Sequence, residues 1–440
     1  MGFYSTDFAR SLSTRTAAAK EKAAASAFFW LSAFYFVYCA RPEDWIPGVG
    51  LLPLAKITAI FALWGLYKIG GLKTEALRKL PLESTFLLAL ITLLYFSAVL
   101  SPIWKGGAIV HTIDFSKCYI VWLLTFLLVT DFSKFRHIVF IQASSVAVIS
   151  LVSVIKGHDQ PRLEGVLGGI YGNPNDLAFA IVLCLPFCLA FLLTAKGPLR
   201  KSLWMGGMLI MGVALLLTAS RAGFVDLVVA GSVCLWHFAI RGKRLYLIAV
   251  TALLGVLLML AAGKTLEKRL IATTGDTEDV QDERAYGSME ARKYLMERAI
   301  EGIEQYPLLG VGINNFLTYS GDWHEVHMSY LQIAVEGGVF ALLLYLLFFS
   351  RGFINLRKLR TYDLDEQTTL FVGALHSSLV GFVVGALFAP EAYQFFPYFT
   401  VGYTSALLAI MQRGGAPAPD DRSRQLSSMA RLQRELYVGS

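Results

Sequence analysis

Long apolar runs, separated mostly by short polar stretches, recur from one end of the chain to the other. About twelve of them approach the roughly 20 residues that an α-helix needs to cross the hydrocarbon core of a bilayer. The pattern predicts an all-α polytopic membrane protein, whose fourth run is short enough to be a tilted or partial span. The runs lie near residues 24–40, 51–69, 84–101, 118–131, 137–155, 174–195, 203–219, 222–240, 245–263, 328–350, 369–389 and 394–412.

The polar segments between these runs define the expected organisation. We expect nine transmembrane helices over residues 24–263 and three over residues 328–412, with polar tails at 1–23 and 413–440. One loop, residues 264–327, is far longer than the others and is expected to contain amphipathic helices. The first run follows a polar stretch and precedes many more, so it is expected to be a retained anchor and not a cleaved signal peptide.

Composition and charge agree with this picture. Hydrophobic residues make up 55% of the chain and charged residues 16%, which is too apolar a balance for a soluble domain. If the N-terminus is cytoplasmic, most of the 39 Lys and Arg residues fall in cytoplasmic segments, as the positive-inside rule requires. The net charge of +7 then reflects membrane anchoring and does not indicate nucleic-acid binding. The five cysteines lack metal-site spacing and are expected to be packing residues.

This topology places several arginines on the outer face. Arg41 follows the first run, Arg162 follows the fifth, and Arg221 lies in a very tight link between the seventh and eighth. An outer arginine can extend its side chain to lipid headgroups. Because positive charge on the outer side works against the positive-inside rule, a functional use is the alternative interpretation.

Arg292 belongs to an amphipathic segment within the long loop. At 100° per residue, residues 289–303 form an apolar face that includes Leu295, Met296, Ala299 and Ile300, and Arg292 falls in the middle of it. A helix packed on the membrane domain would point this arginine inward, where an unpaired charge is costly. Its partner would be either a carboxylate of the protein or a phosphate of a substrate, which a guanidinium binds through two parallel hydrogen bonds.

His327 lies where the long loop meets the tenth apolar run. Residues 322–325 resemble a capping box, so we expect a helix to begin there, with His327 in its first turns. The positive helix end would favour a neutral imidazole, which can act as a general base toward an acceptor hydroxyl. A histidine that only bonds to a neighbour is the alternative interpretation, and His324 is the rival base.

Two carboxylates lie within apolar runs. Glu336 is expected to have a structural pairing role, since acids inside a membrane are usually paired or functional. Asp226 could pair with Arg221. Asp363 and Asp365 have the spacing of a metal-binding pair but are expected on the cytoplasmic face, so we expect neither a metal site nor another cofactor.

Four motifs in order resemble the superfamily of bacterial O-antigen ligases and Wzy-type O-antigen polymerases. They extend over about residues 165–345, and the long outer loop also fits the family. Two positions depart from its pattern: Met328 stands where the family often has Asn, and Met296 where it often has Trp. The motifs are Gly172-Asn-Pro-Asn-Asp-Leu-Ala178, Thr218-Ala-Ser-Arg-Ala-Gly223, Arg292 followed by Tyr306-Pro-Leu-Leu-Gly-Val-Gly312, and His327-Met-Ser-Tyr-Leu-Gln-Ile-Ala-Val-Glu-Gly337.

The resemblance implies a GT-C-type glycosyltransferase of the bacterial inner membrane with a periplasmic active site. Such an enzyme transfers a glycan from undecaprenyl diphosphate to an acceptor sugar, with inversion and without a metal ion. Carried over by position, Arg221 and Arg292 would hold the diphosphate and His327 would activate the acceptor hydroxyl. Further candidate substrate-binding residues are Arg41, Arg162, Asn173, Asn175, His324 and Tyr330.

The acceptor distinguishes the functions that the resemblance allows. A ligase would use lipid A–core oligosaccharide, which is the interpretation we favour, a polymerase would use the next lipid-linked repeat, and a third type would glycosylate a protein. Membrane lipids are the remaining expected partners. A transporter of lipid-linked oligosaccharide is a more remote alternative, because it should show two similar halves with paired broken helices, and the sequence contains no evident internal repeat.

Overall fold

The computed structural model describes residues 3–157, 162–165, 170–256, 280–322 and 324–414. Within these ranges the chain is helical and contains no β-strand, as the sequence predicts. Three expected segments lie outside them: the end of the ninth run at 257–263, the start of the long loop at 264–279, and nearly all of the C-terminal tail.

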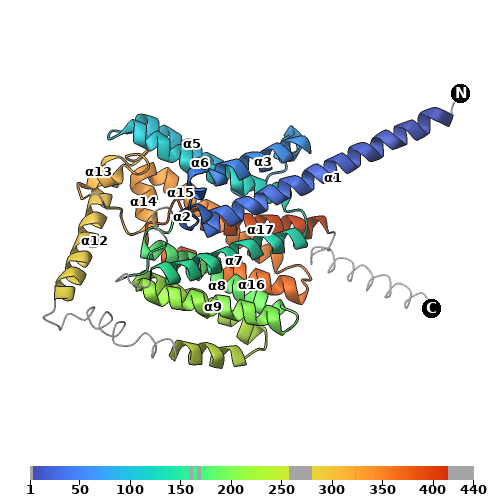
Figure 1. Ribbon diagram of the computed structural model, residues 1–440. Helices are drawn as coiled ribbons and strands as arrows, with labels where there is room; N and C mark the ends of the chain where they lie inside the picture. The colour runs from blue at the N-terminus through green and yellow to red at the C-terminus, as the bar shows by residue number, and fades with distance from the viewer. Residues whose placement is uncertain (1–2, 158–161, 166–169, 257–279, 323, 415–440) are drawn as a thin grey trace, which may run out of the picture.

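The helices follow one another along the chain with short connections (Figure 1). The bounds are α1 (Phe3–Ala40), α2 (Pro42–Trp45), η1 (Val49–Leu51), α3 (Leu54–Lys68), α4 (Thr74–Leu77), α5 (Leu82–Leu100), α6 (Lys105–Leu128), α7 (Phe132–Lys156), α8 (Pro174–Thr194), α9 (Pro198–Thr218), α10 (Arg221–Leu235), η2 (Trp236–Arg241), α12 (Val280–Gln305), α13 (Phe316–Ser320), α14 (Ser329–Gly337), α15 (Val339–Leu359), α16 (Glu366–Gly385) and α17 (Phe395–Arg413). The expected N-terminal tail is helical from Phe3, and this part of α1 extends away from the bundle.

Nine helices in the described ranges are long and apolar enough to cross a membrane, which indicates a multi-pass membrane protein. About twelve were expected. The second run forms only the 15-residue α3, the ninth is described as a helix over Tyr246–Val256 alone, and α17 is not among the nine. Conversely, the fourth run is not a partial span, because it forms the second half of the 24-residue α6.

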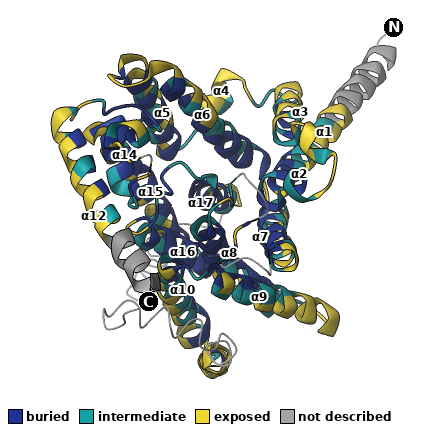
Figure 2. Cartoon of the chain, turned by 60° about the vertical axis from the view of Figure 1, so that its left-hand side comes forward, coloured by how far each residue is buried: buried dark blue, intermediate teal, exposed yellow. Residues whose placement is uncertain are grey.

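The position of α17 explains its modest apolarity. Every residue from Phe396 to Leu408 is buried, and Figure 2 shows α17 in the middle of the bundle. Polar side chains on this helix form hydrogen bonds with other helices of the bundle. For example, the Tyr403 hydroxyl donates to Oε1 of Gln142 on α7 at 2.5 Å. A helix covered by protein on all sides needs no lipid-compatible surface, so hydropathy understates its depth in the bundle.

The tenth apolar run consists of two helices and not one. α14 ends at Gly337 and α15 begins at Val339, and Gly338 between them has φ 83°, a left-handed conformation that favours glycine. Most of α14 is buried, including Ser329, Gln332 and Glu336. The membrane-crossing candidate in this region is therefore α15 alone.

Helix ends and loops distant in sequence meet at one end of the bundle, which we call the His327 end. The Tyr171 hydroxyl donates to the Cys39 carbonyl at 2.8 Å, joining the segment before α8 to the end of α1. Ser101, after α5, donates to the Val311 carbonyl at 2.5 Å. Ser329, at the start of α14, donates to the Ala389 carbonyl at 2.7 Å. These bonds fix the loops that carry most of the candidate site residues.

A buried carboxylate joins three helices at the opposite end. Glu83 of α5 is 1% exposed. Its Oε1 accepts from Asn355 Nδ2 of α15 at 2.7 Å and from Ser405 Oγ of α17 at 2.6 Å, and Oε2 lies 3.3 Å from Arg351 Nε. Because both carboxylate oxygens of Glu83 have partners, this charge is accommodated inside the bundle.

Candidate active site

The tight link between α9 and α10 packs against the 172–176 motif. Ser220 is the N-cap of α10, where its Oγ accepts from the Gly223 amide at 3.0 Å. The same hydroxyl donates to Oδ1 of Asn175 at 2.7 Å. Two motifs that were identified separately in the sequence are therefore one structural unit.

Gly223 permits the close approach of α10 to α8. A Cβ at this position would lie 2.6 Å from Cβ of Ala178, closer than side chains tolerate. The contact holds the first turn of α10 against α8 and so positions Arg221, the first residue of α10. Arg221 itself is exposed at the His327 end.

Two more candidates flank this unit. Arg162 donates from Nε to the carbonyl of Thr218 at 3.1 Å, and the next amide, of Leu163, donates to Leu217. The segment around Arg162 therefore runs along the end of α9, beside Arg221. Asn173 caps α8, because its side chain accepts from the backbone amide of Asn175 at 2.9 Å. A structural role thus accounts for Asn173.

Arg292 lies on α12, which packs beside α13 and α14 at the edge of the bundle (Figure 1). The buried stripe of α12 is narrower than expected: Leu295 and Ala299 are buried, whereas Met296 and Ile300 are 42% and 46% exposed. Because α12 contacts the bundle along one line only, residues to either side of that line remain open. Arg292 is one turn before Leu295, at the end of the stripe, and it is exposed, so the expected burial of this arginine is wrong.

The charges of Arg292 and Arg221 act on each other across the site. Partial burial, and then the positive charge of Arg221, lower the pKa of the Arg292 guanidinium. Within the described ranges neither arginine forms an ion pair with a carboxylate. Two like charges from α10 and α12 are therefore held near each other without a counter-charge from the described part of the protein, an arrangement that an anion would stabilise.

His327 lies just before α14, not within it. The helix begins at Ser329, with Met328 as its N-cap, so the expected helix start at residues 322–325 is wrong. The cause is tertiary: Ser329 bonds to the loop after α16 through both its amide and its hydroxyl, which fixes the start of α14 there. His327 is still within two residues of the positive end of this helix.

The two histidines differ in surroundings. His327 is partly buried, and its Nδ1 receives no hydrogen bond from the described residues. Burial, the positive charge of Arg292 and then His324 lower its pKa to about 4, so the ring is neutral at neutral pH. His324 is 69% exposed, and its Nδ1 lies 2.6 Å from the Asp322 carbonyl oxygen. These features favour His327 over His324 as a base.

Residues 306–312 hold α14 in place. The Val311 amide donates to the Val335 carbonyl at 2.9 Å, and the Gly312 amide donates to the Glu336 carbonyl at 2.8 Å. Gly310 has φ 65°, and a Cβ there would lie 2.4 Å from the Val335 carbonyl oxygen. The glycines of this motif therefore serve the close backbone packing that supports the segment carrying His327.

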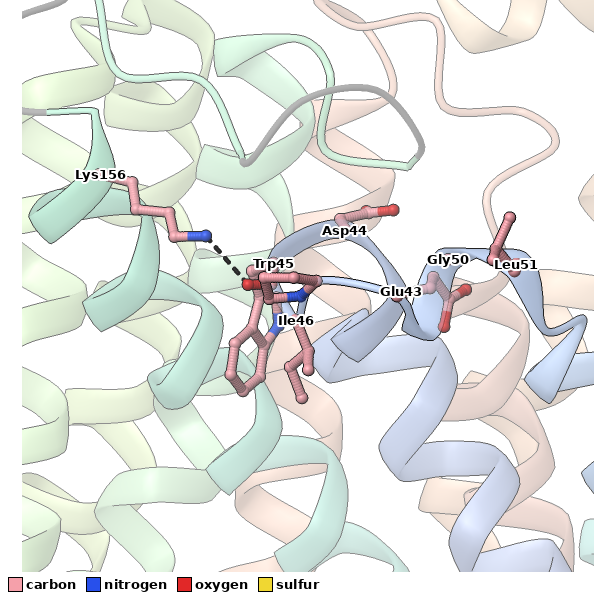
Figure 3. A pocket seen from close by; sticks show the side chains of 9 residues that line it. Glu43, Asp44, Trp45, Ile46, Gly50, Leu51 and Lys156 are labelled. Atoms are coloured by element: carbon pink, nitrogen blue, oxygen red, sulfur yellow. Dashed lines mark hydrogen bonds between the residues drawn. The ribbon is translucent and has the colours of Figure 1, made fainter.

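Arg41 and Tyr330 already have partners within the protein. Arg41 donates to Oδ2 of Asp44 at 2.7 Å and lies 3.4 Å from Glu43. The following loop borders a pocket of about 390 Å³ in which Lys156 donates to the Trp45 carbonyl at 3.0 Å (Figure 3). Tyr330 donates to the Val383 carbonyl at 2.7 Å. Their expected contact with substrate stays a prediction.

The structure corrects the expectations for the two acids that lie within apolar runs of the sequence. Glu336 has no ion-pair partner in the described part of the chain, and its Oε2 is buried without a hydrogen bond. Its side chain lines a cavity together with Asp176 and Glu325, acids that the sequence analysis did not single out. Asp226 is buried against Gly385 of α16 and makes no ion pair with Arg221. Sequence spacing gave no signal for this cavity, because its residues come from distant segments.

A known protein family matches the part of the chain that carries Arg221, Arg292 and His327. Residues 206–346 match the family model described as O-antigen ligase. The match supports the O-antigen ligase superfamily. It includes Arg221, Arg292 and His327, and it ends inside α15. No curated protein matches the sequence.

Proposed function

We propose that this chain is an O-antigen ligase. It would transfer O-antigen polysaccharide from undecaprenyl diphosphate to lipid A–core oligosaccharide on the periplasmic face of the bacterial inner membrane. One observation carries the proposal: Arg221 and Arg292 act on each other electrostatically beside a neutral, partly buried His327. The family match over the same residues supports it.

In this proposal the two arginines bind the diphosphate of the donor. A guanidinium presents a planar set of N–H donors that matches phosphate oxygens and stays charged throughout the reaction. The pair would neutralise the charge that grows on the diphosphate as it leaves, so the reaction would need no divalent ion. Diphosphate binding would also relieve the repulsion between Arg221 and Arg292.

His327 would act as the general base. The acceptor hydroxyl attacks the anomeric carbon of the donor sugar while the imidazole takes up its proton. The new carbon–oxygen bond forms as the bond to the diphosphate breaks, so a single in-line displacement inverts the anomeric configuration. A neutral ring with a free nitrogen is the form that this step requires. A GT-C fold with about twelve spans and a periplasmic long loop belongs to the same proposal.

Deletion of the gene in its host tests the proposal. Lipopolysaccharide would be run on a gel, with complementation by wild type and by His327→Ala. We expect the ladder to vanish while long glycan accumulates on undecaprenyl diphosphate, and only wild type to restore it. Core bearing a single repeat would indicate a polymerase instead. An unchanged ladder would contradict both and favour protein glycosylation or transport.

A further inference from the structure

A half-open cavity of about 370 Å³ lies at the His327 end, which is within the roughly 300–1,000 Å³ typical of small-molecule sites. Four carboxyl side chains from four segments line it: Asp114 of α6, Asp176 of α8, Glu325 before α14, and Glu336 of α14. No described residue of opposite charge lines it. An acidic lining repels phosphate, so the cavity is not a second site for the diphosphate.

Glu336 indicates that the cavity accommodates a ligand. The residue is 2% exposed, and Oε2 is buried without a hydrogen bond from the described residues. Burial raises the pKa of this carboxyl to about 8, so it is mostly protonated at neutral pH and can both donate and accept a hydrogen bond. A buried carboxyl oxygen without a hydrogen bond weakens a fold, and a ligand that bonds to Oε2 explains its presence.

The rest of the lining suits a sugar. Asn314, Gln332 and Gln394 provide amides that can bond to neighbouring hydroxyls, and Asn314 already bonds to His111 at 3.0 Å. Aromatic rings provide apolar surfaces for the C–H faces of a pyranose; they belong to Tyr38, Phe115, Tyr393 and Phe395. The described part of the chain contains no group of His, Cys, Asp or Glu arranged to hold a metal ion, which favours a sugar over a cation.

The cavity lies next to the base. Glu325 is two positions before His327, and Asp176 follows Asn175, the residue that bonds to Ser220 beside Arg221. The segments at 175–176 and 325–327 therefore carry acids of the cavity together with His327 and with Asn175, which bonds to the residue before Arg221. An acceptor in the cavity and a diphosphate at the arginines would both lie near His327.

We propose that this cavity binds the acceptor sugar, an uncharged or amino-substituted pyranose, through the Glu336 carboxyl, the cavity amides and the aromatic rings. This inference rests on the proposed function. In this proposal the two substrates occupy sites of opposite charge. The acidic cavity binds the hydroxyls of the acceptor, and the arginines bind the diphosphate of the donor.

Titration calorimetry on the protein in lipid nanodiscs tests the inference with three probes. These are delipidated core oligosaccharide, one free O-antigen repeat unit, and inorganic pyrophosphate. We expect at least one of the two sugars to bind wild type, and Glu336→Leu to weaken it by about tenfold or more, which corresponds to loss of about one good hydrogen bond. Pyrophosphate binding should not change in this variant. Glu304→Gln, on the exposed side of α12, is the matched control for loss of an acid.

Two readouts separate a ligand role from a structural one. Glu336→Leu removes a buried carboxyl whose Oε2 lacks a hydrogen bond, so the Tm should change little, whereas loss of a structural carboxyl would lower it clearly. Tyr393→Phe, which removes only a hydroxyl beside Glu336, should weaken the same sugar if the leucine variant fails to fold. Binding of neither sugar to wild type, or unchanged binding in both variants, would overturn the inference. If Mg²⁺ alone binds and requires Glu336, the cavity is a cation site.

A failure of the proposed function would appear in pyrophosphate binding and not in sugar binding. Pyrophosphate binding that is absent, or that survives Arg292→Gln unchanged, would count against the arginine pair as a diphosphate site. It would leave the sugar result intact.

Discussion

At the scale of single residues, the protonation of His327 depends on the charge of Arg292. His327 has a lowered pKa because it is partly buried and lies near Arg292. A base with a pKa of about 4 is deprotonated at neutral pH but is intrinsically weak. A bound diphosphate would offset the charge of Arg292 and raise the pKa of His327, so donor binding would strengthen the base.

The pH profile of kcat/KM tests this coupling, because it reports groups of the free enzyme. In wild type we expect activity to fall only as the pH drops through about 4, where the His327 imidazole becomes protonated. Removing a nearby positive charge favours the imidazolium, so Arg292→Gln should move this acid limb to higher pH, toward the ordinary value of about 6.5. The matched control is Lys293→Gln, the exposed neighbour, which should leave the limb in place. An unshifted limb in Arg292→Gln would refute the coupling.

At the scale of elements, close helix contacts position the arginines. The approach of α10 to α8 depends on Gly223, where a Cβ would lie 2.6 Å from Ala178. We expect Gly223→Ala to destabilise the protein by about 1–3 kcal/mol and to lower transfer activity further, because α10 carries Arg221 at its start. Gly231→Ala on the same helix meets open space and should be tolerated. Thermal unfolding and transfer rate would be measured on both, and equal behaviour would contradict this account.

The Glu83 network is predicted to matter for stability and not for chemistry. Glu83→Ala leaves Asn355 and Ser405 without their buried acceptor and Arg351 without its partner. Loss of one member of such a network should cost on the order of 3 kcal/mol. The Tm in detergent should fall clearly, while donor binding below the transition stays normal. Glu75→Ala, at an exposed position, serves as control, and a Tm loss no larger than that of the control would count against the network.

Sequence patterns located most helices and the segments of the candidate site, but not their details. The motif around Arg221 was recognisable, because the two-residue link between the apolar runs 203–219 and 222–240 leaves few conformations. The break at Gly338 was not, because the chain is apolar on both sides and the turn depends on packing against residues 306–312. The acidic cavity was also not predictable, since Asp114, Asp176 and Glu336 meet only through tertiary structure.

At the scale of the whole molecule, the proposal requires the His327 end to face the periplasm. The five native cysteines are buried, so a single introduced cysteine can be labelled with little background. We expect a membrane-impermeant maleimide to label Glu304→Cys in intact spheroplasts and to label Glu75→Cys only after permeabilisation. The reverse pattern would place the site in the cytoplasm and rule out the proposed donor side.

The measurement that tests the central claim most directly is a transfer assay with the purified protein in nanodiscs. Glycan on undecaprenyl diphosphate and lipid A–core would be the substrates, and donor binding would be measured in parallel. We predict that His327→Ala lowers kcat by roughly 10²–10⁴-fold with donor affinity nearly unchanged, while His324→Ala stays close to wild type. Full activity of His327→Ala in well-folded protein would contradict the assignment of His327 as the base.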